Sequence, residues 1–279
     1  MKALVTGAGG QLGRALAARL PSAAALGRRE LDVADAAAVM AAVRSVRPEV
    51  IFNAAAYNGV DAAESDPAAA LGVNAAGALH LARAAAEVGA VLVHVSTDYV
   101  FDGALSRPYR EEDVPRPLNV YGISKRAGEM MVEALGRPCL VVRTSGVFGP
   151  GGSRAKGGSF VDRILDRART GAALRVVDDQ TFAPTYAPDL ARALVALAEK
   201  GARGLVHVTN EGACTWHELA TAALELAGLH VPVERIRASD LAAPAARPPW
   251  SVLSTERFRG LGHGPLRPWR GALAEMLGR

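Results

Sequence analysis

The chain of 279 residues is poor in cysteine, and Cys139 and Cys214 are the only two. They lie far apart in the sequence, and Cys139 opens an apolar run, so buried thiols are expected rather than a disulfide or a metal centre. The six histidines show no spacing typical of metal ligands. The sequence therefore predicts no metal site.

Long apolar runs are also missing. Half of the residues are apolar, but many of these are alanine, and no stretch reaches the about 18 uninterrupted apolar residues that a membrane helix needs. Lys2 is followed at once by the strand-like run Ala3–Thr6, which leaves no room for the regions of a signal peptide. We therefore expect a soluble, cytoplasmic protein with no membrane partner.

Clusters of one charge sign are absent as well. The net charge is +4, yet Arg and Lys alternate with Asp and Glu along the chain, so there is no basic patch or tail for nucleic acid. A mild positive charge is equally expected of an enzyme that binds phosphorylated ligands. We predict a small-molecule substrate and no nucleic-acid partner, and we leave open whether the chain forms a homodimer.

The first half of the chain alternates short β-branched runs with longer, alanine-rich stretches. This pattern is typical of an α/β fold in which helices cover both faces of a doubly wound, Rossmann-type parallel sheet. Strands are predicted near residues 2–6, 23–27, 50–53, 91–96 and 139–143, and helices near 11–19, 35–46, 67–88 and 119–135. Ligands bind beyond the carboxyl ends of such strands, so the strand-end segments 96–98 and 143–145 are candidates for the site.

The pattern changes after residue 149. The glycine-rich stretch 149–158 predicts a mobile loop, and the α/β pattern then resumes with a helix near 159–170, a strand near 174–177, a helix near 188–199 and a strand near 204–208. One further helix after Trp216 precedes a proline-rich stretch. We predict a dinucleotide-binding domain over residues 1–149, to which 188–208 is added, and a smaller C-terminal substrate-binding lobe over 150–187 and 209–279.

Three glycines, Gly7, Gly10 and Gly13, stand at G-x-x-G-x-x-G spacing between the first predicted strand and the first helix. Backbone N–H groups at a helix N-terminus bind a pyrophosphate well, so this position favours a dinucleotide over the alternative of an ordinary glycine-rich turn. The second strand ends in Arg28-Arg29, and arginine there pairs with the 2′-phosphate of NADPH. The alternative is that both arginines face solvent and that Glu30 or Asp32 binds the ribose of NADH.

Tyr121 and Lys125 are four residues apart, and so they share one face of a predicted helix. Hydride transfer to a carbonyl leaves an oxyanion that needs a proton, and a tyrosine beside a cation can supply it. We predict that the ammonium of Lys125 lowers the pKa of the phenol. Thr97, at the end of the fourth strand, is placed to hydrogen-bond the same carbonyl oxygen. The alternatives are a solvent-facing pair, a purely structural threonine, or Ser96 in place of Thr97.

Several longer motifs resemble those of the dTDP-4-dehydrorhamnose reductases, a family of extended short-chain dehydrogenases. The resemblance spans nearly the whole chain and is strongest in the segments 96–103 (STDYVFDG) and 119–125 (NVYGISK). The other matching segments are 7–13, 53–57, 60–61, 63–65, 143–145, 178–180, 184–185 and 247–248.

The resemblance implies a reductase that passes hydride from NADPH, or from NADH, to the C4 keto group of dTDP-4-dehydro-L-rhamnose, giving dTDP-L-rhamnose. It implies that Tyr121 is the acid, that Lys125 also binds the nicotinamide ribose, and that Thr97 tunes the tyrosine. The implied cofactor-binding residues are Gly7, Gly10, Gln11, Leu12 and Gly13, with Arg28, Asp32, Val33, Ala54, Ala55 and Ala56. The implied substrate-binding residues are Thr97, Asp98, Tyr99, Thr185 and Arg247.

Two features depart from the family pattern. The family usually has a tryptophan that packs against the sugar where this chain has Gly146, so a large apolar wall is missing and the identity of the sugar is open. The loop 149–158 is longer than expected and carries Arg154 and Lys156, which we expect to be solvated. Two other functions remain: an epimerase or dehydratase of the same superfamily, and a non-catalytic NADP-binding regulatory subunit.

Overall fold

The computed structural model of the chain describes residues 1–135, 138–151 and 158–279. Within them, six strands form one parallel sheet in the order β10-β5-β4-β3-β1-β2. These strands are β1 (Ala3–Thr6), β2 (Ala24–Leu26), β3 (Val50–Asn53), β4 (Val91–Thr97), β5 (Cys139–Thr144) and β10 (Gly204–His207). The order runs outward from β1 in both directions, which makes the sheet doubly wound and confirms the predicted fold class.

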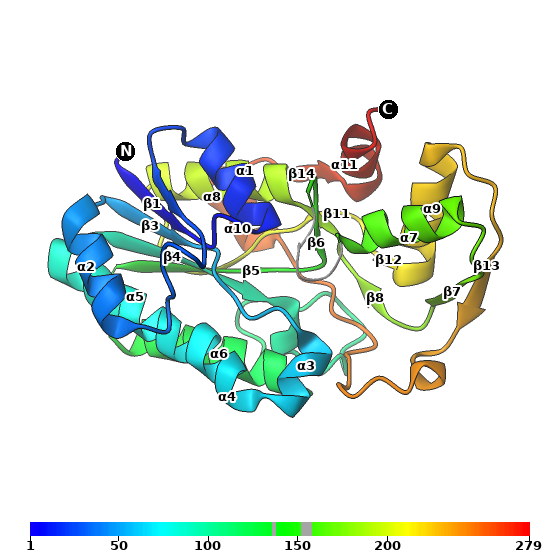
Figure 1. The fold of residues 1–279 in the computed structure, drawn as a ribbon, viewed down its shortest axis with the longest axis horizontal. Helices are drawn as coiled ribbons and strands as arrows, with labels where there is room; N and C mark the ends of the chain where they lie inside the picture. Colours follow the sequence, from blue (N-terminus) through cyan, green and yellow to red (C-terminus); the bar gives the residue numbers. More distant parts are fainter. Residues whose placement is uncertain (136–137, 152–157) are drawn as a thin grey trace.

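Helices cover both faces of this sheet (Figure 1). Because successive side chains of a strand point to opposite faces, Val5 packs with Leu16 and Leu194 on one side, and Leu4 packs with Leu81 on the other. The first face carries α1 (Gln11–Arg19) and α8 (Ala187–Glu199). The second carries α2 (Ala36–Val46), α5 (Gly77–Val88) and α6 (Val120–Ala134).

The helix predicted near 67–88 is not continuous. It consists of α4 (Pro67–Leu71), a π-helical turn (Gly72–Ala76) and α5, and a short helix that was not predicted, α3 (Val60–Ser65), precedes it. Within the π-helical turn, the buried Asn74 accepts from the backbone N–H of Tyr57 at 2.8 Å and donates to Ser124 Oγ at 2.9 Å. The turn thus joins the loop after β3 to α6, and such turns often occur at functional sites.

Most of the remaining elements form a second group beside the carboxyl ends of the main strands (Figure 1). Its helices are α7 (Phe160–Arg169), α9 (Trp216–Ala227) and α11 (Trp269–Met276), whereas the short α10 (Glu256–Gly260) packs against β10 of the main sheet. Its strands pair as β6 (Val147–Phe148) with β9 (Thr185–Tyr186), β7 (Leu174–Val177) with β13 (Val233–Ile236), β8 (Thr181–Phe182) with β12 (Cys214–Thr215), and β11 (Asn210–Glu211) with β14 (Leu266–Pro268).

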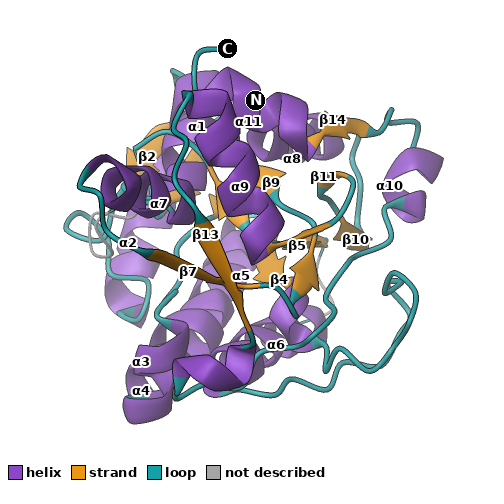
Figure 2. Ribbon diagram, turned by 90° about the vertical axis from the view of Figure 1, so that its right-hand side faces the viewer, coloured by secondary structure: helices purple, strands orange, loops and turns teal. Residues whose placement is uncertain are grey.

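The later predicted strands join different sheets. β10 extends the main sheet by pairing with β5, whereas β7 pairs with β13 and lies apart from that sheet. Figure 2 shows β7 and β13 in front of β4 and β5. A separate hydrophobic core, which includes Val161, Phe182 and Leu219, holds this second group together.

None of the helices in the described residues is long and apolar enough to cross a membrane. Arg154 and Lys156, which we expected to be solvated, lie outside the described residues.

Candidate active site

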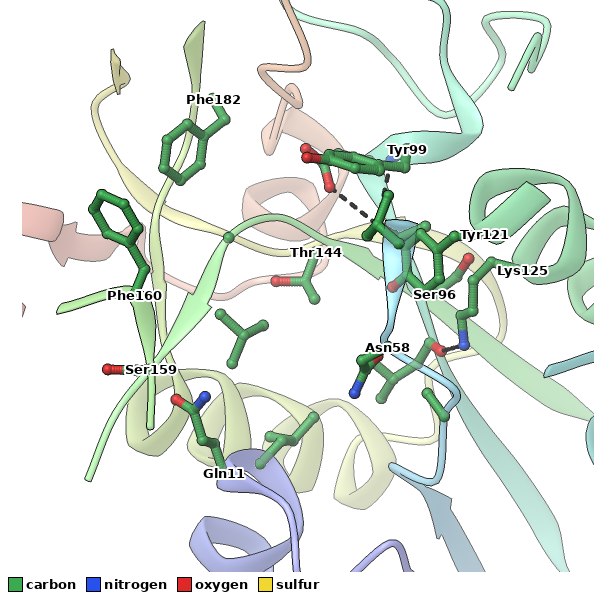
Figure 3. A pocket seen from close by; sticks show the side chains of 18 of the residues that line it. Gln11, Asn58, Ser96, Tyr99, Tyr121, Lys125, Thr144, Ser159, Phe160 and Phe182 are labelled. Carbon is green, nitrogen blue, oxygen red and sulfur yellow. Dashed lines mark hydrogen bonds between the residues drawn. The ribbon is translucent and has the colours of Figure 1, made fainter. Parts of the chain in front are cut away.

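A cavity of about 350 Å³ lies where the carboxyl ends of the main strands meet the second group of elements. Both parts contribute to its lining: Gln11, Thr97 and Tyr121 come from the first, and Phe160 and Phe182 from the second. Figure 3 shows Gln11 at one end of the cavity and Tyr121 with Lys125 at the other. The cavity is therefore elongated between the glycine-rich turn and the predicted reactive pair.

The glycine-rich turn is shaped by close contacts between main chains. Gly7 has φ of +69°, and a Cβ atom there would lie 2.5 Å from the backbone nitrogen of Ala55. A Cβ atom on Gly13 would lie 2.1 Å from the carbonyl oxygen of Gly7. Only glycine fits both positions, and the absence of side chains lets the start of α1 face the cavity. The predicted cofactor residues that line the cavity are Gly10, Gln11, Leu12, Gly13, Ala54, Ala55 and Ala56.

Two polar atoms of the cavity lining point to a polar ligand. Gln11 Oε1 and Thr144 Oγ1 are buried and have no hydrogen-bond partner among the described residues. Buried polar side chains are nearly always hydrogen-bonded, so such atoms in a cavity wall are best explained by a molecule that fills it. Together with the side-chain-free turn at Gly7 and Gly13, these residues fit a dinucleotide that lies along the cavity.

Tyr121 and Lys125 stand in the first two turns of α6. The helix begins at Val120 because Asn119 caps it, accepting from the backbone N–H of Gly122 at 2.7 Å. The same side chain donates to the carbonyl oxygen of Ala246 at 2.7 Å, which ties the start of the helix to the C-terminal part of the chain. Both Tyr121 and Lys125 line the cavity, as does Thr97. The structure therefore brings the three predicted catalytic residues together.

The ammonium of Lys125 is held by the neighbouring strand. Its Nζ donates to the main-chain oxygen of Val95 at 2.6 Å, and the side chain is buried. Burial lowers the pKa of Lys125 to about 8, although the Glu129 carboxylate, one turn further along α6, opposes this shift. Glu129 in turn binds the buried Arg143 through two hydrogen bonds of 2.8 Å.

Burial also raises the pKa of Tyr121, to about 12, although a hydrogen bond with Thr97 acts in the opposite direction. The predicted low pKa of the phenol is therefore not found, because the effect of burial exceeds that of the neighbouring groups. The physical reason is that loss of solvent disfavours the phenolate, while the ammonium is directed at Val95. The phenol is thus held in its protonated form, which is the form that a proton donor needs.

Asp98, which follows Thr97, accepts hydrogen bonds from a cluster of hydroxyl groups. Its Oδ1 accepts from Thr97 Oγ1 at 3.0 Å, and its Oδ2 accepts from Ser145 Oγ at 2.7 Å and from Ser251 Oγ at 2.5 Å. The Thr97 hydroxyl also interacts with the hydroxyl of Tyr121. Burial raises the pKa of Asp98 to about 6, although the three hydroxyl groups act against this shift.

Six predicted residues are not among the described residues that line the cavity, and one of them is Gly7, whose backbone lies within the glycine-rich turn. Arg28 and Asp32 are exposed beyond the end of β2, and Val33 is buried in the core beneath them. Thr185 is fully buried and donates to the carbonyl oxygen of Ala183 at 3.3 Å. The guanidinium of Arg247 binds Asp61 Oδ2 at 2.7 Å and also contacts Tyr99, which itself lines the cavity.

Sequence reasoning missed several residues that the cavity contains. Phe160, Phe182 and Trp216 form an aromatic group in its wall, and Ser251 supplies a hydroxyl to Asp98. No motif marks them, because they come from separate segments that meet only in the folded chain. The glycine that replaces the usual tryptophan at position 146 was the one indication that this wall is built differently.

Comparison with known proteins places the chain in a family. A family model described as the RmlD substrate binding domain matches residues 1–279. The chain belongs to this family. The dTDP-4-dehydrorhamnose reductase of Streptomyces griseus is 45% identical over 285 residues, which cover 98% of this chain and 91% of that protein. The enzyme of the same name from Mycobacterium tuberculosis H37Rv is 44% identical over 284 residues, with the same coverage.

A solved structure of the family is also similar. The crystal structure of dTDP-4-dehydrorhamnose reductase from Bacillus anthracis, in complex with NADP, has a TM-score of 0.94 and 35% sequence identity, and the match covers 99% of each chain. The family membership predicted from the sequence motifs is therefore confirmed.

Proposed function

We propose that the chain is an NADPH-dependent reductase that converts the C4 keto group of dTDP-4-dehydro-L-rhamnose to the alcohol of dTDP-L-rhamnose. The observation that carries this proposal is one cavity lined both by the Gly10–Gly13 turn and by Thr97, Tyr121 and Lys125. The relatives that bear the name of this activity match the chain over nearly its full length.

The dinucleotide would bind along the cavity, with its pyrophosphate at the glycine-rich end. Gly10, Gln11 and Leu12 would hold the pyrophosphate at the N-terminus of α1, and Ala54, Ala55 and Ala56 would lie along its other side. The chemistry that NADPH supplies when bound is hydride transfer. We further propose that Arg28 binds the 2′-phosphate, because its exposed side chain follows β2, the strand whose end lies beside the adenosine in such folds.

The reacting end of the cavity provides the proton. Tyr121 keeps its proton because burial raises the pKa of the phenol, and it donates that proton to the substrate oxygen as negative charge develops there. Thr97 holds the phenol oxygen and is itself held by Asp98. The buried ammonium of Lys125 stabilises the phenolate that remains, since a cation beside an anion in a poorly solvated site interacts strongly.

The two parts of the chain would bind different ligands. We propose that residues 1–149 with 188–208 bind the dinucleotide, and that 150–187 with 209–279 bind the substrate together with Asp98 and Tyr99. Two hydrogen bonds across this division support the proposal: Ser251 Oγ to Asp98 and Asn119 Nδ2 to the carbonyl oxygen of Ala246. Thr185 and Arg247 would act on the substrate side, Arg247 through Tyr99. Because NADPH is the reductant of the cytoplasm, we place the reaction there.

The decisive experiment follows the absorbance of NADPH with dTDP-linked and UDP-linked 4-keto-6-deoxy sugars. A reductase consumes one NADPH for each product molecule, whereas an epimerase or a dehydratase regenerates its nicotinamide. We expect stoichiometric consumption with the dTDP-linked sugar, and its loss in Tyr121→Phe. Tight NADPH binding without oxidation by any keto sugar would instead favour a regulatory subunit.

A further inference from the structure

The ring of Phe182 lies directly on the backbone of Gly146. Gly146 has φ of +48°, and a Cβ atom there would lie 2.2 Å from Cε2 and 2.5 Å from Cδ2 of Phe182. No real Cβ atom comes that close to another carbon, so a side chain at position 146 and the ring at position 182 exclude each other. The two residues are 36 positions apart in the sequence and occupy one space in the fold.

Phe182 belongs to an aromatic group in the cavity wall. Its ring centroid lies 4.1 Å from that of Trp216, which in turn lies 4.8 Å from that of Phe160. All three residues line the cavity. Figure 3 shows Phe160 and Phe182 on the side of the cavity away from Tyr121 and Lys125. A ligand that reaches Tyr121 therefore has an aromatic surface on its opposite side.

The position of this wall relative to the reacting group follows from hydrogen bonds. Ser145, which precedes Gly146, donates to Asp98 Oδ2 at 2.7 Å. Thr181, which precedes Phe182, accepts through its carbonyl oxygen from the backbone N–H of Ser251 at 2.9 Å, and the Ser251 hydroxyl donates to the same carboxylate. The residues that precede Gly146 and Phe182 are thus both connected by hydrogen bonds to the cluster around Asp98, which also holds Thr97.

We propose that Phe182, supported by Trp216 and Phe160, is the wall against which the sugar ring of the substrate packs. This inference rests on the proposed function. A 6-deoxyhexose presents an apolar face of C–H groups and a methyl group, and an aromatic side chain offers a matching flat surface. The wall expected to be missing at Gly146 is therefore supplied by β8, and Gly146 is the residue that leaves room for it.

Phe182 is only 4% exposed and packs in the core of the second group, so its removal also affects folding. Phe148 provides a matched control: it is 2% exposed, belongs to the same core cluster, and is not among the described residues that line the cavity. Phe148→Ala and Phe182→Ala create similar losses of packing. Phe182→Leu keeps most of the buried volume but removes the flat face.

The experiment measures binding of dTDP-L-rhamnose and of dTDP by calorimetry in the presence of NADP⁺, together with the thermal stability of each variant. We expect Phe182→Ala to weaken dTDP-L-rhamnose binding about tenfold and dTDP binding less than about twofold, with Phe182→Leu intermediate. Phe148→Ala should lower the melting temperature by a similar amount while it leaves both affinities within about twofold of the wild type.

Other outcomes overturn the proposal. If Phe182→Ala weakens both ligands equally, or neither, the wall does not face the sugar. If Phe148→Ala has the same selective effect, the loss comes from the core and not from the wall. Failure of the proposed function alone would give a different result. The wild type would bind dTDP-L-rhamnose more tightly than dTDP, and Phe182→Ala would abolish this difference in affinity. No 4-keto sugar, however, would oxidise NADPH. A wild type that binds neither ligand contradicts both.

Discussion

Lys125 donates from Nζ to the main-chain oxygen of Val95 at 2.6 Å, so α6 and β4 are joined at the reacting end of the cavity. This bond holds the ammonium against the strand that ends at Thr97 and is followed directly by Asp98. The buried cation is therefore in place before any ligand binds, and no reorganisation is needed when negative charge develops on the neighbouring phenol.

Replacement of Tyr121 by phenylalanine removes the proton donor. Proton transfer from a positioned side chain contributes about 10²–10⁴ in rate, so we expect kcat to fall by about that factor, with NADPH affinity within about twofold of the wild type. The measurement is steady-state reduction together with NADPH binding by fluorescence.

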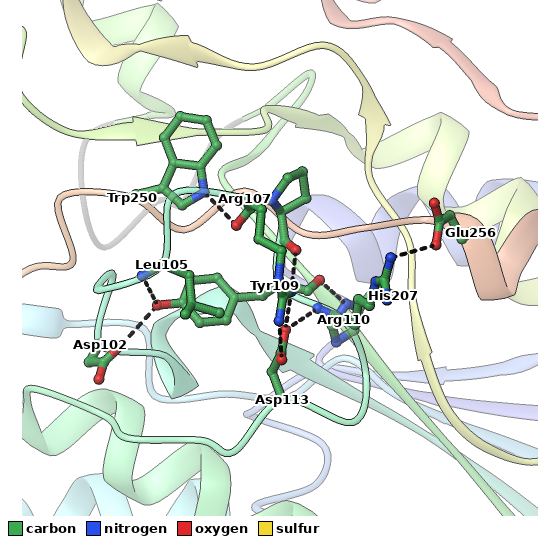
Figure 4. Close-up of polar contacts among 10 residues, drawn as sticks. Asp102, Leu105, Arg107, Tyr109, Arg110, Asp113, His207, Trp250 and Glu256 are labelled. Atoms are coloured by element: carbon green, nitrogen blue, oxygen red, sulfur yellow. Dashed lines mark hydrogen bonds and ion pairs between the residues drawn. The ribbon is translucent and has the colours of Figure 1, made fainter.

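Tyr109→Phe is the control for this substitution. Tyr109 is also a tyrosine with a hydrogen-bonded hydroxyl, but it is not among the described residues that line the cavity. Its hydroxyl donates to Asp102 at 2.8 Å and accepts from the backbone N–H of Leu105 at 3.3 Å (Figure 4). Loss of the Tyr109 hydroxyl should lower the free energy of unfolding and leave kcat unchanged. An equal fall of kcat in both variants would contradict the role of Tyr121.

Asp98 should make stability depend on pH. Burial raises its pKa from 3.8 to about 6 in the folded chain, so the folded state holds the proton more tightly than the unfolded state. The stabilisation is fully present below about pH 4 and is lost as the pH rises through about 6. Relative to Asp98→Asn, the free energy of unfolding of the wild type should therefore fall by up to about 3 kcal/mol between about pH 4 and pH 7.

Urea denaturation at several pH values tests this dependence, with Asp113→Asn as the control. Arg107 lowers the pKa of Asp113 to about 2, so its titration lies below the range examined and the slope above about pH 4 should stay that of the wild type. Parallel stability curves for the wild type and Asp98→Asn would show that the Asp98 carboxylate is solvated like any other.

Arg28→Ala tests the preference for NADPH. A hydrogen-bonded pair with a charged group contributes about 1.5–3 kcal/mol, so we expect the KM for NADPH to rise about tenfold or more while the KM for NADH changes less than about twofold. Arg29→Ala is the matched control, because Arg29 is the next residue and is equally exposed. An equal rise of KM for both cofactors in Arg28→Ala, or a rise for NADPH alone in Arg29→Ala, would show that Arg28 does not bind the 2′-phosphate.

Glu129→Ala should destabilise the chain strongly. Glu129 and Arg143 are 0% and 1% exposed, and removing the carboxylate leaves a buried guanidinium without its partner, which costs about 3–5 kcal/mol. Glu133→Ala on the same helix removes a carboxylate that is 43% exposed and 3.6 Å from Arg126, and it should cost less than about 1 kcal/mol. Chemical denaturation measures both, and equal losses would contradict the importance of burial.

Local features of the site could be predicted from the sequence. The turn at Gly7–Gly13 needs residues without side chains, and this requirement depends on contacts within a short stretch of chain and with the next strand. The spacing of Tyr121 and Lys125 follows from the pitch of one helix, and Asn119 before it marks the start. Runs of apolar residues likewise predicted the central strands of the main sheet, because strands such as β1 and β3 are buried on both faces.

Other features depend on which segments meet. The sequence predicted one helix near 67–88, but Asn74 binds Tyr57 and Ser124 from two other elements, and the helix opens into a π-helical turn at that point. The net shift of the Tyr121 pKa is upward and not downward as predicted, because desolvation is set by everything packed around the phenol and not by its helical neighbour alone.

The sequence by itself determined the parallel sheet, the glycine-rich turn and the reactive pair, since steric limits and side-chain periodicity act over a few residues. The tertiary structure alone decided that Phe182 fills the space over Gly146 and that Ser145 and Ser251 converge on Asp98. Burial, pKa values and contacts between segments 36 to 153 positions apart are properties of the packed chain, and no local pattern encodes them.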